Sequence, residues 1–154
     1  PEPEDAGREP SYVERQSLRD RLKAAGCLAE YPALAHAQLA ELFKISDIML
    51  LPSLSEPQGM VMLEALASGC LTISSNTGGI RESIRHGETG FLLDRPEDME
   101  RVTEQVRVVL ERREALAAMR RAARADVLIR FDWQVVTDRL ETLYFKVTGR
   151  TPTT

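Results

Sequence analysis

Two glutamates, Glu56 and Glu64, carry the clearest chemical signal in the sequence, and seven residues separate them in the segment EPQGMVMLE. An ionised carboxylate accepts hydrogen bonds from two neighbouring hydroxyls, and such charge-assisted bonds contribute about 1.5 to 3 kcal/mol each when shielded from water. Sugars and riboses present such pairs of hydroxyls. Spacing alone favours a plainer interpretation, in which Glu64 stabilises the start of a helix electrostatically and Glu56 is a loop charge.

The residues between the glutamates suit an anion. Gly59 precedes a helix predicted to begin near Met60, and a glycine lets the backbone approach a ligand closely. The N–H groups near Gly59, Met60 and Val61 would lie unpaired at the positive end of the helix dipole. The start of this helix could therefore hold a phosphate or diphosphate, with one carboxylate on each side for a hydroxyl-bearing group, beside the plainer interpretation given above.

An α/β fold must position these residues, because short apolar runs alternate with helical segments along the middle of the chain. Runs at 48–51, 71–75 and 91–93 fit buried strands. Crossovers between such strands produce a parallel sheet covered by helices, and ligands bind beyond the carboxyl ends of the strands. The predicted helices are 14–26, 36–46, 60–69 and a short one that begins after Gly79 and ends near His86 and Gly87.

The last third of the chain is predicted to be helical, with three apolar stripes that face a core. Trp133, the only tryptophan, lies on the third stripe and is expected in the core. The stripes are Met99, Val102, Val106, Val109 and Leu110, then Leu116, Met119 and Ala123, then Trp133, Val136, Leu140, Leu143, Tyr144 and Val147.

The charge and composition of the chain limit the kinds of partner that it is expected to bind. The chain has 154 residues and a formal net charge of -4, which fits one domain and argues against nucleic acid or an anionic membrane. An arginine-rich helix is interrupted by acidic residues, so a solvated helix face is favoured over a nucleic-acid surface. The residues concerned are Arg112, Arg113, Arg120, Arg121 and Arg124, with Glu111, Glu114 and Asp126 among them.

Cysteine usage and the absence of an apolar run of about 18 residues predict a soluble, cytoplasmic protein without an integral membrane segment. Cys27 and Cys70 have no metal-ligand spacing and are interpreted as ordinary thiols. His36 and His86 have no partner at metal-ligand or catalytic spacing, so exposed or helix-capping roles are favoured for both.

The stretch from Leu39 to Leu93 resembles the donor-binding domain of retaining glycosyltransferases of the two-Rossmann-domain (GT-B) architecture, in their large family four. The resemblance runs through LAELFKISDIMLLPSLSEPQGMVMLEALASGC and TISSNTGGIRESIRHGETGFLL, and more weakly through FDWQVVTDRLETLY. Its most specific element is the Glu-x7-Glu motif. The resemblance implies a partial GT-B C-terminal domain, with a Rossmann-like parallel sheet flanked by helices and a helical C-terminus.

The resemblance also implies residue roles. Glu56 would contact hydroxyls of the donor sugar and is the candidate catalytic residue, and Glu64 would bind the ribose hydroxyls. Amides of Gly59, Met60 and Val61 would face sugar or phosphate oxygens.

Further donor-site positions follow from the same resemblance. Gln58 departs from the aromatic residue often found at its place, which usually acts through its backbone. The loop Asn76-Thr77-Gly78-Gly79 resembles the family's turn into the same cleft, so Gly78 and Gly79 are donor-binding candidates. The alternative interpretation is that this loop only ends the strand and begins the next helix, with no role in binding.

The function implied is transfer of a hexose from a nucleoside diphosphate sugar to an acceptor hydroxyl with retention of configuration. The family's basic phosphate loop and its acceptor-binding N-terminal domain have no counterpart in the sequence, so the isolated chain is expected to be inactive. No cofactor or metal is expected. We expect disordered segments at 1–10 and 148–154 around a partial domain at 11–147. The alternative is a non-catalytic nucleotide-sugar-binding or interaction module derived from such a domain.

Overall fold

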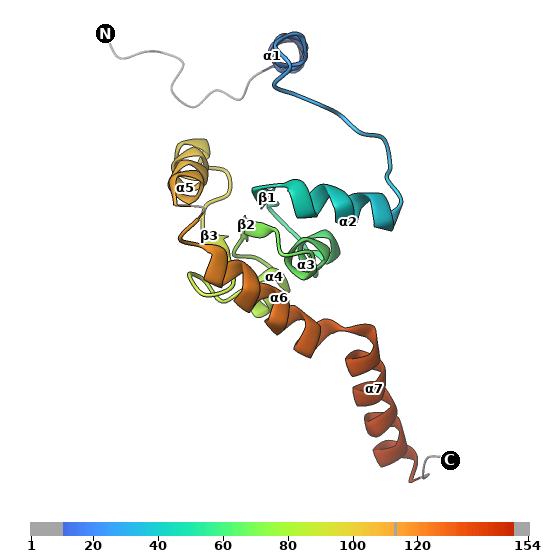
Figure 1. The fold of residues 1–154 in the computed structure, drawn as a ribbon. Coiled ribbons are helices and arrows are strands. Elements are labelled where there is room, and N and C mark those ends of the chain that lie inside the picture. The colour runs from blue at the N-terminus through green and yellow to red at the C-terminus, as the bar shows by residue number, and fades with distance from the viewer. Residues whose placement is uncertain (1–10, 113, 150–154) are drawn as a thin grey trace. The chain divides into compact units, whose positions relative to one another are not determined.

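The computed structural model describes residues 11–112 and 114–149, and the contacts divide the chain into two compact units, Pro1–Ala35 and His36–Thr154. The predicted disordered segment 1–10 and most of 148–154 lie outside the described residues. The elements are α1 Tyr12–Ala24, α2 His36–Ile45, β1 Ile48–Leu51, α3 Met60–Ala67, β2 Leu71–Ser75, α4 Ile80–Ser83, β3 Phe91–Leu93, α5 Met99–Glu111, α6 Ala117–Phe131 and α7 Trp133–Thr148 (Figure 1).

The first unit contains α1, a surface helix with a capping box at its start. The Ser11 N–H donates to the Glu14 carboxylate at 2.6 Å, and the Glu14 N–H donates to the Ser11 hydroxyl at 3.3 Å. Gly26 follows the helix with a φ of 68°, which confirms the predicted stop. None of the residues of α1 is buried, as expected for a surface helix.

The second unit is built on a parallel sheet with strand order β1-β2-β3, which confirms the predicted fold class. Leu51 pairs with Ser74, and Ser75 pairs with Leu93, so the three strands end at the same edge. The loops that follow β1, β2 and β3 therefore leave the sheet side by side, at the edge where α/β folds place their ligands.

Helices cover both faces of this sheet. On one face, α3, α4 and the middle of α6 form a cluster with Met49, Leu51 and Leu92. On the other, Val102 and Val109 of α5 and Met119 of α6 pack in a cluster with strand residues. The strand residues on this second face are Ile48, Leu71, Ile73, Phe91 and Leu93. Successive side chains of β1 and β3 thus point into different apolar layers, whereas β2 gives Leu71 and Ile73 to the second layer only, and this pattern fixes the register of the sheet.

Arginines of α6 lie at the surface, as a solvated helix face predicts, and Arg121 and Arg124 are exposed. Some of these arginines also bind backbone carbonyl groups. Arg120 donates to the carbonyl of Asp47 at 2.9 Å, Arg124 donates to that of Ala67, and Arg130 to that of Glu82. These carbonyls lie before β1, at the end of α3 and after α4 begins. The arginines therefore fasten α6 across the helices of one sheet face.

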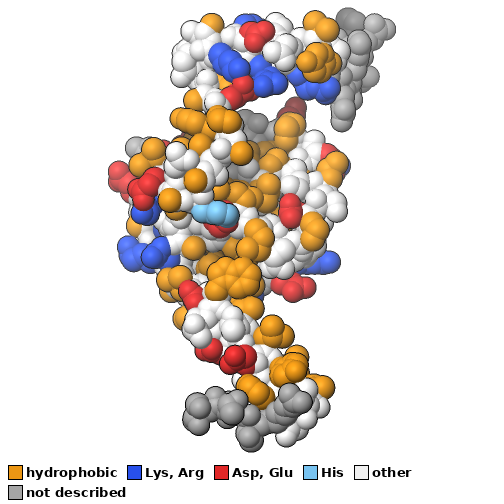
Figure 2. All heavy atoms as spheres, turned by 90° about the vertical axis from the view of Figure 1, so that its right-hand side faces the viewer, with side chains coloured by type: hydrophobic (Ala, Val, Ile, Leu, Met, Phe, Trp, Pro, Cys, Tyr) orange, Lys and Arg blue, Asp and Glu red, His pale blue; other side chains and the backbone are white. Residues whose placement is uncertain are grey.

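The third apolar stripe, on α7, is exposed rather than buried, so the placement of Trp133 in the core is wrong. Trp133 is 75% exposed and Leu140 is 64% exposed, and none of the residues of α7 is buried. Figure 2 shows hydrophobic side chains along this helix at the bottom of the view. Helical periodicity predicts that apolar side chains share a face, but not that another element covers it.

Two smaller differences concern helix ends. Met99 and Leu110, at the ends of the first predicted stripe, are exposed, whereas Val102 and Val109 are buried. The end of α7 lies at Thr148, one residue into the segment expected to be disordered.

None of the helices in the described residues has the length and apolar character needed to cross a membrane.

Candidate functional site

The candidate site begins where β1 ends. The hydroxyls of Ser74 and Ser75 both donate to the carbonyl of Leu51, at 3.2 Å and 3.3 Å. All backbone polar groups buried at this point need partners, and these two bonds satisfy the last carbonyl of the strand. The start of the loop from residue 52 to 59 is therefore fixed against β2.

Glu56 closes this loop onto the start of α3. Its carboxylate accepts a hydrogen bond of 3.0 Å from the N–H of Gly59, which has a φ of 73°. The Gly59 amide, predicted to face a ligand, is thus already engaged by Glu56. In the described part of the chain, the N–H groups of Met60 and Val61 form no hydrogen bond, so two of the three predicted amides are unused by the fold.

Gly78 and Gly79 lie directly against the backbone of the Glu56 loop. A Cβ on Gly78 would lie 1.9 Å from the carbonyl oxygen of Glu56, and one on Gly79 would lie 2.5 Å from that of Pro57. The Gly79 N–H donates to the Pro57 carbonyl at 2.8 Å. The glycines of this loop therefore allow the loops after β1 and β2 to touch.

Side chains strengthen this junction. The Gln58 side-chain amide donates to the Ser83 hydroxyl at 3.5 Å, and that hydroxyl donates to the Gly79 carbonyl at 3.0 Å. Asn76 joins the third loop, since its side-chain amide donates to Asp94 at 2.8 Å and its N–H to the Leu93 carbonyl at 2.8 Å. The spacing of Asn76 and Asp94 in the sequence does not predict this contact, since only the register of β2 against β3 brings the two side chains together.

Glu64 has a partner that sequence spacing did not predict. Nδ1 of His36, the first residue of α2, lies 3.2 Å from a carboxylate oxygen of Glu64. The Glu64 side chain is 34% exposed and that of His36 is 92% exposed. The expected exposed position of His36 is confirmed, and the nearby Glu64 is a neighbour that the sequence spacing did not indicate.

His86 has a structural role instead. Its Nδ1 accepts a hydrogen bond of 3.0 Å from the N–H of Leu92. It lies beyond α4, which ends at Ser83 rather than near His86 as predicted, because Ile84 has an extended backbone with ψ of 127°. The N–H of Arg85 then donates to the Thr89 hydroxyl at 2.9 Å, which turns the chain toward β3.

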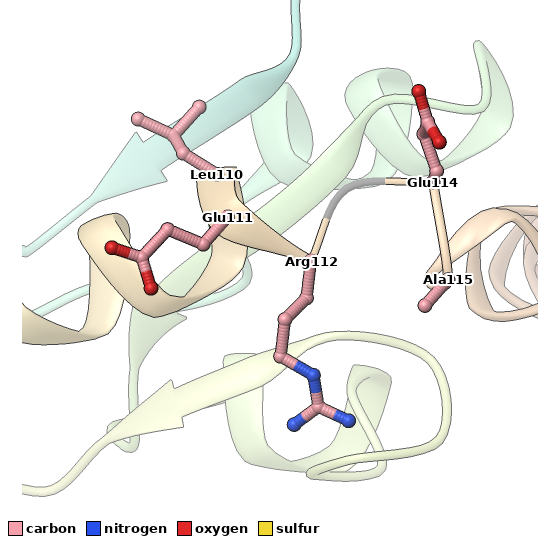
Figure 3. Close-up of a pocket in the computed structure, with 5 residues that line it drawn as sticks. All are labelled: Leu110, Glu111, Arg112, Glu114 and Ala115. Atoms are coloured by element: carbon pink, nitrogen blue, oxygen red, sulfur yellow. The ribbon is translucent and has the colours of Figure 1, made fainter.

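The second unit has hollows and ionisable groups away from Glu56 and Glu64. A hollow of about 590 Å³ at the α5–α6 connection is lined by Leu110, Glu111, Arg112, Glu114 and Ala115. In Figure 3 the side chains of Glu111, Arg112 and Glu114 point in different directions. Among the described residues, no three His, Cys, Asp or Glu side chains gather as a set of metal ligands. Burial raises the pKa of the Cys70 thiol, which favours its unreactive protonated form.

Residues 9–126 match the sequence model of the family described as "Glycosyl transferases group 1". The glycogen synthase of Mycobacterium tuberculosis is 38% identical over 111 residues, which cover 72% of this chain and 27% of that relative. The chain thus spans about a quarter of the length of the curated relatives it matches.

Two solved structures share the fold. One is the C-terminal domain of a glycosyl transferase group 1 family protein from Francisella tularensis, with a TM-score of 0.65 and 20% identity over 79% of this chain and 64% of that one. The other is Anabaena HepE in complex with UDP, with a TM-score of 0.69 and 24% identity over 86% of this chain and 37% of that one.

Proposed function

Since this chain belongs to the glycosyl transferases group 1 family, we propose that it is the donor-binding half of a nucleotide-sugar-dependent glycosyltransferase. The observation that carries the proposal is the position of Glu56 and Glu64 around the start of α3, where the N–H groups of Met60 and Val61 have no partner in the described residues. The UDP bound to the Anabaena relative supports a nucleotide as the ligand.

The two carboxylates take different parts of the donor. Glu64, on the body of α3, accepts hydrogen bonds from the ribose hydroxyls, and Glu56, in the loop, accepts them from the sugar. The diphosphate between these groups lies at the positive end of the helix dipole, where the Met60 and Val61 amides donate to its oxygens. For this, the Glu56 carboxylate exchanges its bond with Gly59 for bonds to the sugar, which leaves a third amide for the donor.

The proposed reaction breaks the bond between the anomeric carbon and the diphosphate oxygen. A new bond forms from that carbon to the acceptor oxygen, and the acceptor's proton passes to the released diphosphate or to solvent. This domain contributes to catalysis in two ways. Glu56 positions the sugar, and the amides at the start of the helix stabilise the negative charge that develops on the departing diphosphate. We also propose that the anomeric carbon keeps its configuration in this reaction. The acceptor is bound by another domain of the full-length protein.

NMR titration of the chain with UDP, GDP and ADP, and then with their sugar conjugates, tests this function. We expect shifts in the backbone N–H signals of Met60 and Val61 at millimolar nucleotide, since the binding of such ligands alters the amides they contact. A nucleotide-release assay with candidate acceptors should show no turnover by this chain alone. Binding elsewhere, or no binding of any nucleotide, would contradict the proposal. Binding of nucleotide sugars by a full-length protein that never transfers them would favour a non-catalytic module.

A further inference from the structure

We propose that His36 is a positioning residue that holds the Glu64 carboxylate in the orientation in which it accepts the ribose hydroxyls. The inference deepens the proposed function and rests on it. Its basis is the 3.2 Å separation between Nδ1 of His36 and one carboxylate oxygen of Glu64, two residues on different helices.

The packing of α2 on α3 sets this separation. Phe43 and Leu39 of α2 lie in one apolar cluster with Ala65 and Val61 of α3. Phe43 is 7% exposed and Ala65 is fully buried, so the two helices meet through a closely packed contact on both sides. This apolar contact holds α2 against α3, and the first residue of α2 lies beside Glu64.

The chemistry of the pair fits a hydroxyl-binding site. An imidazole nitrogen at this distance is a polar neighbour that restricts the rotation of the Glu64 carboxylate, so less freedom is lost when a ligand binds. The contact occupies Oε1 of Glu64. The second carboxylate oxygen makes no hydrogen bond or ion pair with the described residues, so it is available as an acceptor for a ribose hydroxyl.

Two substitutions of His36 distinguish a polar contact that positions Glu64 from an effect of side-chain size alone. In His36→Asn, the side-chain amide nitrogen takes nearly the place of Nδ1, whereas His36→Ala removes the contact. Both variants and Glu64→Ala are titrated by NMR with whichever of UDP, GDP and ADP binds the native chain, and with the 2′,3′-dideoxy form of the same nucleotide.

We expect His36→Ala to weaken binding of the nucleotide about three- to tenfold, the range for loss of one restraining polar contact. His36→Asn should stay within about twofold of the native chain, and none of the variants should change binding of the dideoxy form. Equal binding by His36→Ala and the native chain, or an equal loss for the dideoxy form, would overturn the positioning role. If Glu64→Ala also has no effect on nucleotide binding, the proposed function fails with it; if only Glu64→Ala weakens binding, the proposed function stands and the role of His36 does not.

Discussion

The N–H of Gly79 donates a 2.8 Å hydrogen bond to the carbonyl of Pro57, which joins the loop after β2 to the loop after β1. The neighbouring Gly78, with a φ of 50°, touches the backbone of Glu56. The position of the Glu56 carboxylate thus depends on a second loop that contains no charged side chain. Any residue larger than glycine at position 78 must displace the donor loop.

Gly78→Ala should destabilise the chain by about 2 to 5 kcal/mol, which combines the cost of a left-handed alanine with that of an overpacked contact. Gly87→Ala is the matched control, because Gly87 has a φ of 79° and no atom within 4 Å of an added Cβ. Its cost should be about 1 to 2 kcal/mol. Urea denaturation measures both, and equal effects of the two substitutions would show that the loop contact is unimportant.

Asp126 makes the stability of the chain depend on acid. Partial burial opposes its ionisation, but hydrogen bonds from Arg85 at 2.6 Å and Arg130 at 2.9 Å outweigh this and hold the pKa of Asp126 below its ordinary value of 3.8. A carboxyl whose pKa is depressed by folding stabilises the protein above its unfolded-state pKa. That contribution is lost as the pH falls through the depressed value.

Asp126→Asn should therefore lower the free energy of unfolding by about 1.5 to 3 kcal/mol at pH 7, and the difference from the native chain should shrink below pH 3.8. Glu104→Gln is the control, since the Glu104–Arg107 pair is exposed to solvent and its loss should change the stability far less than the loss of the Asp126 carboxylate. Denaturation curves collected between pH 7 and acid conditions provide the comparison. A difference for Asp126→Asn that stays constant down to the lowest pH would contradict this assignment.

Local sequence patterns predicted the elements well, because strand and helix periodicities act over a few residues. The strands at 48–51, 71–75 and 91–93 have the predicted bounds. Contacts between distant residues were not predictable in the same way. His36 and Glu64 meet only because α2 packs on α3, and Asn76 meets Asp94 only because β2 pairs with β3. The exposed stripe of α7 is a similar case. Its periodicity predicts that the apolar side chains share one face of the helix, but it does not predict whether another element packs on that face.

The contrast between buried and exposed stripes has a direct test in two leucines on helices. Leu66 is fully buried in α3 and Leu140 is 64% exposed on α7. Leu66→Ala should cost about 2 to 5 kcal/mol, whereas Leu140→Ala should change the stability of the chain by less than about 0.5 kcal/mol. Thermal unfolding distinguishes them, and a large loss for Leu140→Ala would mean that the stripe is packed in solution.

Nucleotide binding should not require a divalent cation, because helix amides and not carboxylate clusters are proposed to face the phosphates. The affinity for a nucleoside diphosphate should therefore differ by less than about threefold between EDTA and magnesium. Parallel NMR titrations measure both. Binding that disappears in EDTA and returns with magnesium or manganese would contradict this prediction.

We propose that Glu64 binds the ribose and Glu56 the sugar, and one set of calorimetric or NMR titrations can distinguish these two roles. The ligands are a nucleoside diphosphate and its sugar conjugate, and the variants are Glu64→Ala and Glu56→Ala. Glu64→Ala should weaken binding of the diphosphate by about 1.5 to 3 kcal/mol. Glu56→Ala should leave that affinity nearly unchanged, since the diphosphate lacks the sugar that Glu56 is proposed to contact, but should remove any affinity that the sugar adds. The reverse pattern, or no effect of either substitution, would contradict the assignment of the two carboxylates.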